Sequence, residues 1–195
     1  MKNLFTILIF AIAFASCNNS DNPESAELKK PAIEKSKFFP VTGFLKGAIF
    51  TIKKNEGPFK KYITINEKTD SVYLNPSDLD EVLREFLTPE IDTANLATLF
   101  TEKSFIDQTI NAVTLTYEPV ASLPDSMKLV RWDVYIDPDN GSVRRIYLVK
   151  EISKNKTLQL TWVVDEWCKI ITIITDDKGI SNIEKEEKII WDPNK

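Results

Sequence analysis

Alternation of apolar and polar residues limits what this 195-residue chain can fold into more than any other feature of its sequence. Apolar side chains fall on every second position in residues 113–117, 130–136 and 158–164. A period of two places apolar side chains on one face of a strand and polar ones on the other, as in antiparallel strands with one buried face. Together with residues 143–150 and 168–175, these segments predict five consecutive strands in a meander. Residues 181–187 fit either an edge strand or a turn of helix.

The segments before these strands contain helical patterns. Apolar residues recur at helical spacing in residues 38–54 and 77–88, and Ser77 and Pro89 supply start and stop signals for the second segment. A shorter helical turn is expected within residues 93–100. A hairpin of two short strands is expected between the longer helices, at residues 61–65 and 71–74. The expected fold class is therefore α+β, with N-terminal helices packed on a curved antiparallel β-sheet meander.

The start of the chain has the pattern of an export signal. Lys2 supplies a positive charge, residues 4–15 form an uncharged apolar run, and small residues lead to Cys17. The apolar run is shorter than the roughly 20 residues that a membrane-spanning helix needs. A cleaved signal is therefore favoured over a retained transmembrane anchor. An ordinary secretory signal is the other, less favoured alternative.

The end of this signal resembles the lipobox of bacterial lipoproteins. Ala15, Ser16 and Cys17 match its last three positions, and Phe14 stands where that family usually carries Leu. The resemblance implies removal of a signal peptide, residues 1–16, and acylation of Cys17 as the membrane anchor. It also implies a location in the cell envelope.

The position after the anchor bears on the choice of membrane. In the lipoprotein class an Asp there favours the inner membrane, so Asn18 favours the outer membrane over the inner one. Residues 17–37 are polar and predict a lipidated cysteine followed by a flexible tether. Residues 38–195 then form a single α+β globular domain.

Composition excludes several kinds of chemistry. The chain has no histidine, so Ser-His-Asp and Cys-His arrangements and imidazole metal ligands are absent. Its five glycines form no phosphate-binding loop, and residues 137–141 fit a turn better than a calcium loop. The net charge of −4, without a cluster of Lys and Arg, argues against nucleic acid as a partner. We therefore expect no cofactor, no metal site and no catalytic residue of these types.

The second cysteine has no intrachain partner once Cys17 is acylated. Cys168 lies in an apolar run, and free cysteine is among the most buried residue types. Without histidine nearby, nothing in the sequence lowers the pKa of this thiol. The sequence predicts that Cys168 is an unreactive core residue.

The hairpin around residues 137–141 gives the most specific prediction of strand pairing. If Ile136 pairs with Ser142, then Trp132 lies opposite Ile146 on an apolar face. A slip of one residue would place apolar residues opposite charged ones, and register selection normally avoids such mixing.

The polar face of the same hairpin is the candidate binding face. The favoured register places Asp133 opposite Arg145 and Arg131 opposite Tyr147, with Tyr135 on the same face. Arg131, Tyr135, Arg145 and Tyr147 combine aromatic and guanidinium groups, which suits a polar or anionic partner. An ordinary solvated sheet face, with a surface ion pair worth about 0–1 kcal/mol, is the alternative.

Two functions remain open from the sequence. The favoured one is a lipid-anchored cell-envelope protein of non-catalytic binding or assembly type, whose partner besides the membrane is a protein, a glycan or a small molecule. The alternative is a carboxylate-dependent hydrolase, for example a glycan-directed one, on the same anchor. Two acids converging in one cleft would support the hydrolase, whereas an aromatic and apolar cleft without paired acids would support binding.

Overall fold

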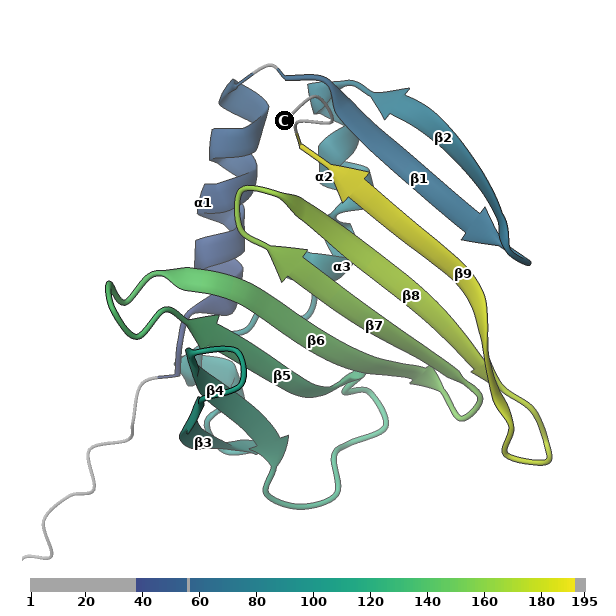
Figure 1. Ribbon diagram of the computed structural model, residues 1–195. Helices are drawn as coiled ribbons and strands as arrows, with labels where there is room; N and C mark the ends of the chain where they lie inside the picture. The colour runs from purple at the N-terminus through teal and green to yellow at the C-terminus, as the bar shows by residue number, and fades with distance from the viewer. Residues whose placement is uncertain (1–37, 56, 192–195) are drawn as a thin grey trace, which may run out of the picture. The chain divides into compact units, whose positions relative to one another are not determined.

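The computed structural model describes residues 38–55 and 57–191, so the predicted signal peptide, Cys17 and the tether lie outside the described residues. Nine strands form one antiparallel sheet in the order β2-β1-β9-β8-β7-β6-β5-β4-β3 (Figure 1). The strands are β1 (Phe59–Ile65), β2 (Lys68–Leu74), β3 (Phe100–Asp107), β4 (Ala112–Pro119), β5 (Leu129–Ile136), β6 (Val143–Ser153), β7 (Lys156–Val163), β8 (Trp167–Thr175) and β9 (Ser181–Ile190). The helices are α1 (Val41–Lys54), α2 (Leu79–Val82), α3 (Arg84–Leu87) and α4 (Thr93–Leu96), with a 3₁₀ turn, η1 (Pro76–Asp78), before α2.

The predicted α+β class, with a layer of N-terminal helices on a five-stranded meander, is wrong. Antiparallel strands dominate the described residues, and α1 is the one helix among them longer than four residues. The five predicted strands of the C-terminal half are present as β4 to β8. The sheet extends well beyond them, because β3 adds one edge and β9 joins β8 to the hairpin of β1 and β2.

The longest predicted helix after α1 is broken. The segment predicted from Ser77 begins as the 3₁₀ turn η1 and then forms two single turns, α2 and α3, which meet at Leu83. Asn75 caps this segment instead of Ser77, and its backbone N–H donates to the Asp78 carboxylate at 2.8 Å. The apolar residues of this segment are spaced as predicted, but they lie on separate turns instead of on one continuous helix.

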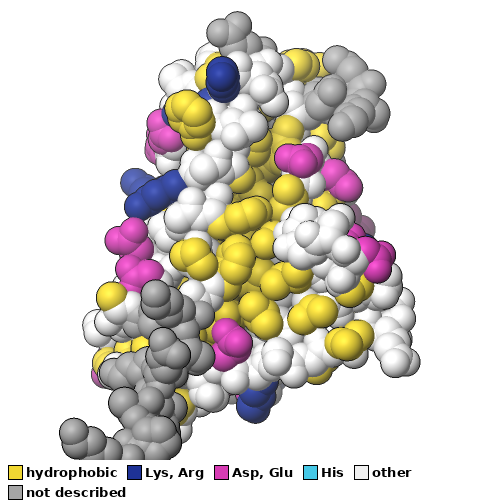
Figure 2. Space-filling view, turned by 90° about the vertical axis from the view of Figure 1, so that its left-hand side faces the viewer, with side chains coloured by type: hydrophobic (Ala, Val, Ile, Leu, Met, Phe, Trp, Pro, Cys, Tyr) yellow, Lys and Arg dark blue, Asp and Glu magenta, His cyan; other side chains and the backbone are white. Residues whose placement is uncertain are grey.

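The helix α1 follows its sequence pattern closely. Val41, Leu45, Ile49 and Ile52 recur at helical spacing and are buried, while Lys53 and Lys54 lie in the last turn, where the helix dipole favours cations. Figure 2 shows the side of the molecule on which α1 lies, with hydrophobic side chains along its centre and charged ones toward its edges.

The hairpin of β5 and β6 does not have the predicted register. Ile136 lies opposite Val143 instead of Ser142. Arg144 is an extra residue in β6, because the residues on either side of it pair with consecutive residues of β5. An extra residue of this kind is a β-bulge, which redirects side chains locally.

The turn and the bulge each shift the pairing by one residue. Trp132 therefore lies opposite Leu148 instead of Ile146. A total shift of two residues restores the alternation of faces, since side chains repeat every second residue along a strand. The apolar face stays apolar even though the predicted pairs are wrong.

The apolar face forms one buried core together with side chains of α1, α2 and α3. Trp132 is fully buried and stacks on Tyr117, with ring centroids 4.6 Å apart. Trp162 is buried in the same core and meets Phe86 edge-on at 5.5 Å. These four rings are among the largest fully buried side chains of the core, and aromatic side chains bury the largest areas.

The prediction that Cys168 is a core residue is confirmed. Its side chain is 1% exposed, and burial raises the pKa of its thiol. We therefore expect a bulky maleimide to leave Cys168 unmodified in the folded protein and to label it fully in guanidinium chloride. The measurement uses mass spectrometry on a Cys17→Ser chain, in which Cys168 is the remaining thiol. Rapid labelling of the native protein would contradict this prediction.

Candidate binding face

The side of the sheet opposite the buried core, here called the outer face, carries the predicted binding residues. Arg131, Tyr135, Arg145 and Tyr147 lie on neighbouring strands β5 and β6 and are half-buried or exposed. The residues that alternate with them point into the core. The structure therefore brings the four side chains onto one face, although not in the predicted pairs.

Arg145 and Tyr135 form the closest pair on this face. They are direct cross-strand partners, and the guanidinium carbon of Arg145 lies 3.9 Å from the centre of the Tyr135 ring. Within residues 38–55 and 57–191, Arg145 forms no ion pair with a carboxylate. A guanidinium that packs against a ring through its carbon keeps its N–H donors at the edges of its own plane, where an anion can accept them.

A buried carboxylate organises the other half of the predicted face. Asp133, which is 1% exposed, accepts a hydrogen bond from the Thr116 hydroxyl at 2.6 Å and another from Arg131 at 3.3 Å. It lies opposite Tyr147 instead of the predicted Arg145. Burial, and then the negative charge of Asp133, raises the pKa of Tyr147. The Tyr147 hydroxyl therefore stays protonated and able to donate.

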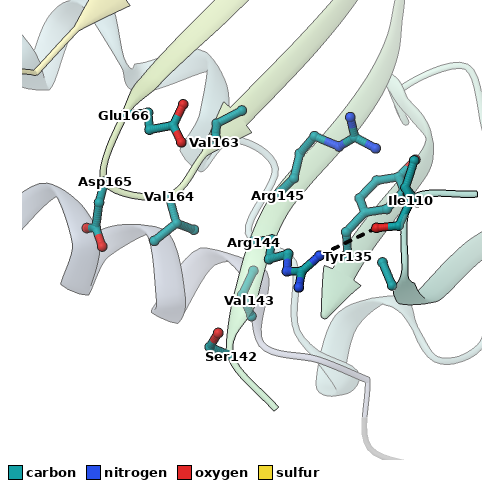
Figure 3. Close-up of a pocket in the computed structure, with 11 residues that line it drawn as sticks. Ile110, Tyr135, Ser142, Val143, Arg144, Arg145, Val163, Val164, Asp165 and Glu166 are labelled. Atoms are coloured by element: carbon teal, nitrogen blue, oxygen red, sulfur yellow. Dashed lines mark hydrogen bonds between the residues drawn. The ribbon is translucent and has the colours of Figure 1, made fainter. Parts of the chain in front are cut away.

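A cavity of about 500 Å³ lies at the end of this face, where three turns meet. Figure 3 shows Arg145 and Tyr135 on one side of it, with Asp165 and Glu166, from the turn after β7, on the opposite side. Apolar side chains, including Val163, line the space between them. The cavity thus presents a cation on an aromatic ring, two carboxylates and an apolar floor.

The bulged residue Arg144 braces this cavity. Its guanidinium donates to the Asp137 carboxylate, with Nε 2.9 Å away, and to the backbone oxygens of Asn111 at 3.1 Å and Ile110 at 3.4 Å. The hydrogen bond from Arg144 is the largest of several that lower the pKa of Asp137. Arg144 therefore ties the β5–β6 hairpin to the β3–β4 turn and is a structural residue.

Of the charged and aromatic residues that line the cavity, the sequence analysis named Tyr135 and Arg145 and did not name Arg144, Asp165 and Glu166. Strict alternation would place Arg144 on the apolar face, because a bulge leaves no mark in a hydrophobicity pattern. Asp165 and Glu166 were overlooked as turn residues. Asp165 has a φ of 61°, which Asp tolerates better than most residues, so an acidic pair at a tight turn was the available signal.

An acid in a second cavity is neutralised by two lysines. In a second cavity of about 560 Å³, over the core side of β7 to β9, Glu187 accepts from Lys61 at 2.7 Å and from Lys185 at 2.8 Å. Burial alone would raise the pKa of Glu187, but the hydrogen bonds from these lysines outweigh it and lower the pKa. Glu187 is therefore deprotonated at neutral pH and unsuited to act as a general acid.

The described residues also bear on metal binding and on membrane insertion. Within the described residues, no group of three or more Cys, Asp or Glu side chains is arranged to hold a metal ion. None of the helices there is both long and apolar enough to cross a membrane.

The fold and this face define an antiparallel β-sheet protein with aromatic and cationic side chains on its outer face. Comparison with known proteins adds no relative: no family model, curated protein or solved structure matches the chain.

Proposed function

We propose that this chain is a lipid-anchored cell-envelope protein that binds a partner without catalysis, through the outer face of β5 and β6 and the adjoining cavity. The observation that carries the binding part is Arg145, stacked on Tyr135 at 3.9 Å and without a carboxylate partner in the described residues. A partly buried cation that lacks an internal anion is available to an external one.

The chemistry of the face favours an anionic group on the partner. A guanidinium binds a carboxylate or a phosphate through two parallel N–H donors, and the ring of Tyr135 fixes its plane. The protonated hydroxyl of Tyr147 adds a further donor on the same strand. The two N–H donors of Arg145 and the hydroxyl of Tyr147 lie on one sheet and together suit a polar, negatively charged surface.

The anchor follows from the sequence. The export signal, Cys17 and the absence of Asp at position 18 support acylation and the outer membrane. We expect residues 17–37 to act as a polar tether; a flexible chain of this length has a root-mean-square span of roughly 25 Å, enough to reach from a bilayer to a partner near its surface. The proposed partner is therefore one that lies near a membrane surface.

The hydrolase alternative has weaker support. Asp165 and Glu166 both line the cavity, but they are consecutive residues of one turn. Glycoside hydrolysis needs two carboxyl groups that flank the scissile bond, and acids from two elements satisfy that requirement more readily than neighbours in a turn.

The test of the binding face uses glucuronate, a small carboxylate probe, and the side-chain NMR signals of the arginines. We expect glucuronate to shift the Nε–H signal of Arg145 in the wild type. Arg145→Gln should weaken glucuronate binding roughly tenfold or more, because a hydrogen bond to a charged group is lost. Lys154→Gln, which removes one exposed charge at the β6–β7 turn, is the matched control and should bind as the wild type does. Equal binding by wild type, control and Arg145→Gln would contradict the proposal.

A further inference from the structure

The strand register aligns one residue from each of the nine strands in a single row across the outer face. In spatial order from β3 to β2, the row contains Phe105, Thr114, Tyr135, Arg145, Val163, Trp167, Ile190, Lys60 and Tyr73. Six of these nine side chains are aromatic or cationic. We call this row, with the adjacent Tyr62 and Lys188, the outer band.

The cations of the outer band lie on aromatic rings. Lys60 is 5.0 Å from the ring centre of Tyr62 and 5.5 Å from that of Tyr73. Lys188 is 4.7 Å from the ring centre of Trp167. Together with Arg145 on Tyr135, these contacts make three units, each of one cation and at least one ring.

These cations have no carboxylate partner in the part of the chain that the structure describes. Lys60, Arg145 and Lys188 each interact with a ring and form no ion pair there. The whole chain is acidic, with a net charge of −4, so unpaired cations gathered on one face are a local excess of positive charge.

Three acids on the strands of the outer face already have partners. Glu118 accepts from Lys103 at 2.5 Å, and Glu186 lies 3.4 Å from Lys169. Asp133 is buried beneath Arg131 and Thr116. These three acids therefore do not cancel the positive charge of the outer band. Asp165 and Glu166, in the turn that joins Val163 to Trp167, lie opposite Arg145 across the cavity.

The three units are evenly spaced. Tyr135, Trp167 and Tyr73 lie on β5, β8 and β2, and each of these strands is three positions from the next in the sheet order. Neighbouring strands lie about 4.8 Å apart, so the rings repeat at roughly 14 Å. A regular repeat of rings and cations matches a linear polymer that carries anionic groups at intervals and flat, weakly polar surfaces between them.

We propose that the outer band binds one acidic polysaccharide chain, which lies across the strands with its sugar rings on Tyr135, Trp167 and Tyr73 and its carboxylates on Arg145, Lys188 and Lys60. This inference rests on the proposed binding function and names the class of its ligand. Sugar rings present C–H groups that pack on aromatic faces, and their acidic groups pair with the cations. Nucleic acid would need far more phosphate neutralisation than three cations in an acidic chain supply.

The test measures the dissociation constant of polygalacturonate for the full-length chain in detergent, with dextran as the uncharged polysaccharide and a single-stranded oligonucleotide as the nucleic acid. We expect polygalacturonate to bind, dextran and the oligonucleotide to bind at least tenfold more weakly, and digalacturonate to bind more weakly than the polymer because it reaches one unit. Lys60→Gln should weaken polygalacturonate binding roughly tenfold. Tyr73→Ala, at a side chain that is 66% exposed, should weaken it about threefold.

Matched controls lie off the outer band. Phe50→Ala removes a 70% exposed ring on α1, and Lys154→Gln removes an exposed charge; both should bind as the wild type does. If Arg145→Gln weakens binding while Lys60→Gln and Tyr73→Ala do not, the inference is overturned and the proposed function stands. If none of the three variants changes binding, both fail. Binding of the oligonucleotide or of dextran as tightly as polygalacturonate would also overturn the inference.

Discussion

Trp132→Ala is expected to lower the free energy of unfolding by about 3–5 kcal/mol, in the range of large aromatic deletions from a core. Trp132 is fully buried, stacks on Tyr117 with the ring planes 9° apart, and lies 4.7 Å from the ring centre of Phe100. Its removal leaves a cavity beside rings that belong to β3 and β4. Rigid strands cannot close such a cavity, so most of the lost contact energy is not recovered.

The measurement is urea unfolding followed by circular dichroism, with a thermal melt beside it. For a chain of this size the expected loss corresponds to a melting temperature lower by about 6–20 °C. Phe50→Ala is the matched control, because Phe50 is 70% exposed and should change stability by at most about 0.5 kcal/mol. A Trp132→Ala variant within 1 kcal/mol of the wild type would show that this ring cluster does not hold the sheet together.

The same strand shows what a sequence pattern specifies and what it leaves open. Alternation assigned Trp132 to the buried face and Arg131 to the outer face, and both are there. The partners across the hairpin were wrong, because the turn and the bulge at Arg144 each shifted the register by one residue. Burial determines which face a side chain lies on, but it does not distinguish two strand registers that differ by two residues. Turn geometry and bulges therefore determine which residues pair across the hairpin.

The prediction of the fold class was wrong for a different reason, which β9 illustrates. β9 lies inside the sheet, between β8 and β1, yet its sequence is rich in charged residues. Lys185 and Glu187 point to the core side of the sheet and satisfy each other at 2.8 Å. An interior strand whose charges pair with one another lacks the apolar alternation that marks a strand, so the sequence indicated an edge strand or a helical turn.

The outer band also depends on β9, whose place in the sheet the sequence did not indicate. Lys60 and Tyr73 belong to the hairpin of β1 and β2, whereas Trp167 belongs to β8, far from them in the sequence. β9 brings them into one row by joining β8 to β1. Their alignment depends on a strand pairing that sequence alone did not indicate. The part of the face built from adjacent strands, Tyr135 and Arg145, was the part that could be predicted.

The largest functional effect is expected from Cys17→Ser, which should abolish acylation of the chain. The Cys17 thiol is the acceptor that the signal offers, and serine at that position lacks the sulfur to which the lipid is attached. If Cys17 carries the proposed anchor, a chain without acyl groups has no stable hold on the bilayer, because durable attachment requires more than one lipid chain or a second membrane signal. We therefore expect the variant to accumulate as a longer, unprocessed precursor or to leave the membrane fraction.

Incorporation of radiolabelled palmitate measures this directly, with fractionation of the cells beside it. Cys168→Ser is the matched control, since it removes the other thiol of the chain and leaves the signal intact. It should incorporate as much label as the wild type, while Cys17→Ser incorporates none. Equal labelling of Cys17→Ser and the wild type would remove the lipid anchor from the proposed function, and the sheet would then meet its partner as an unanchored protein.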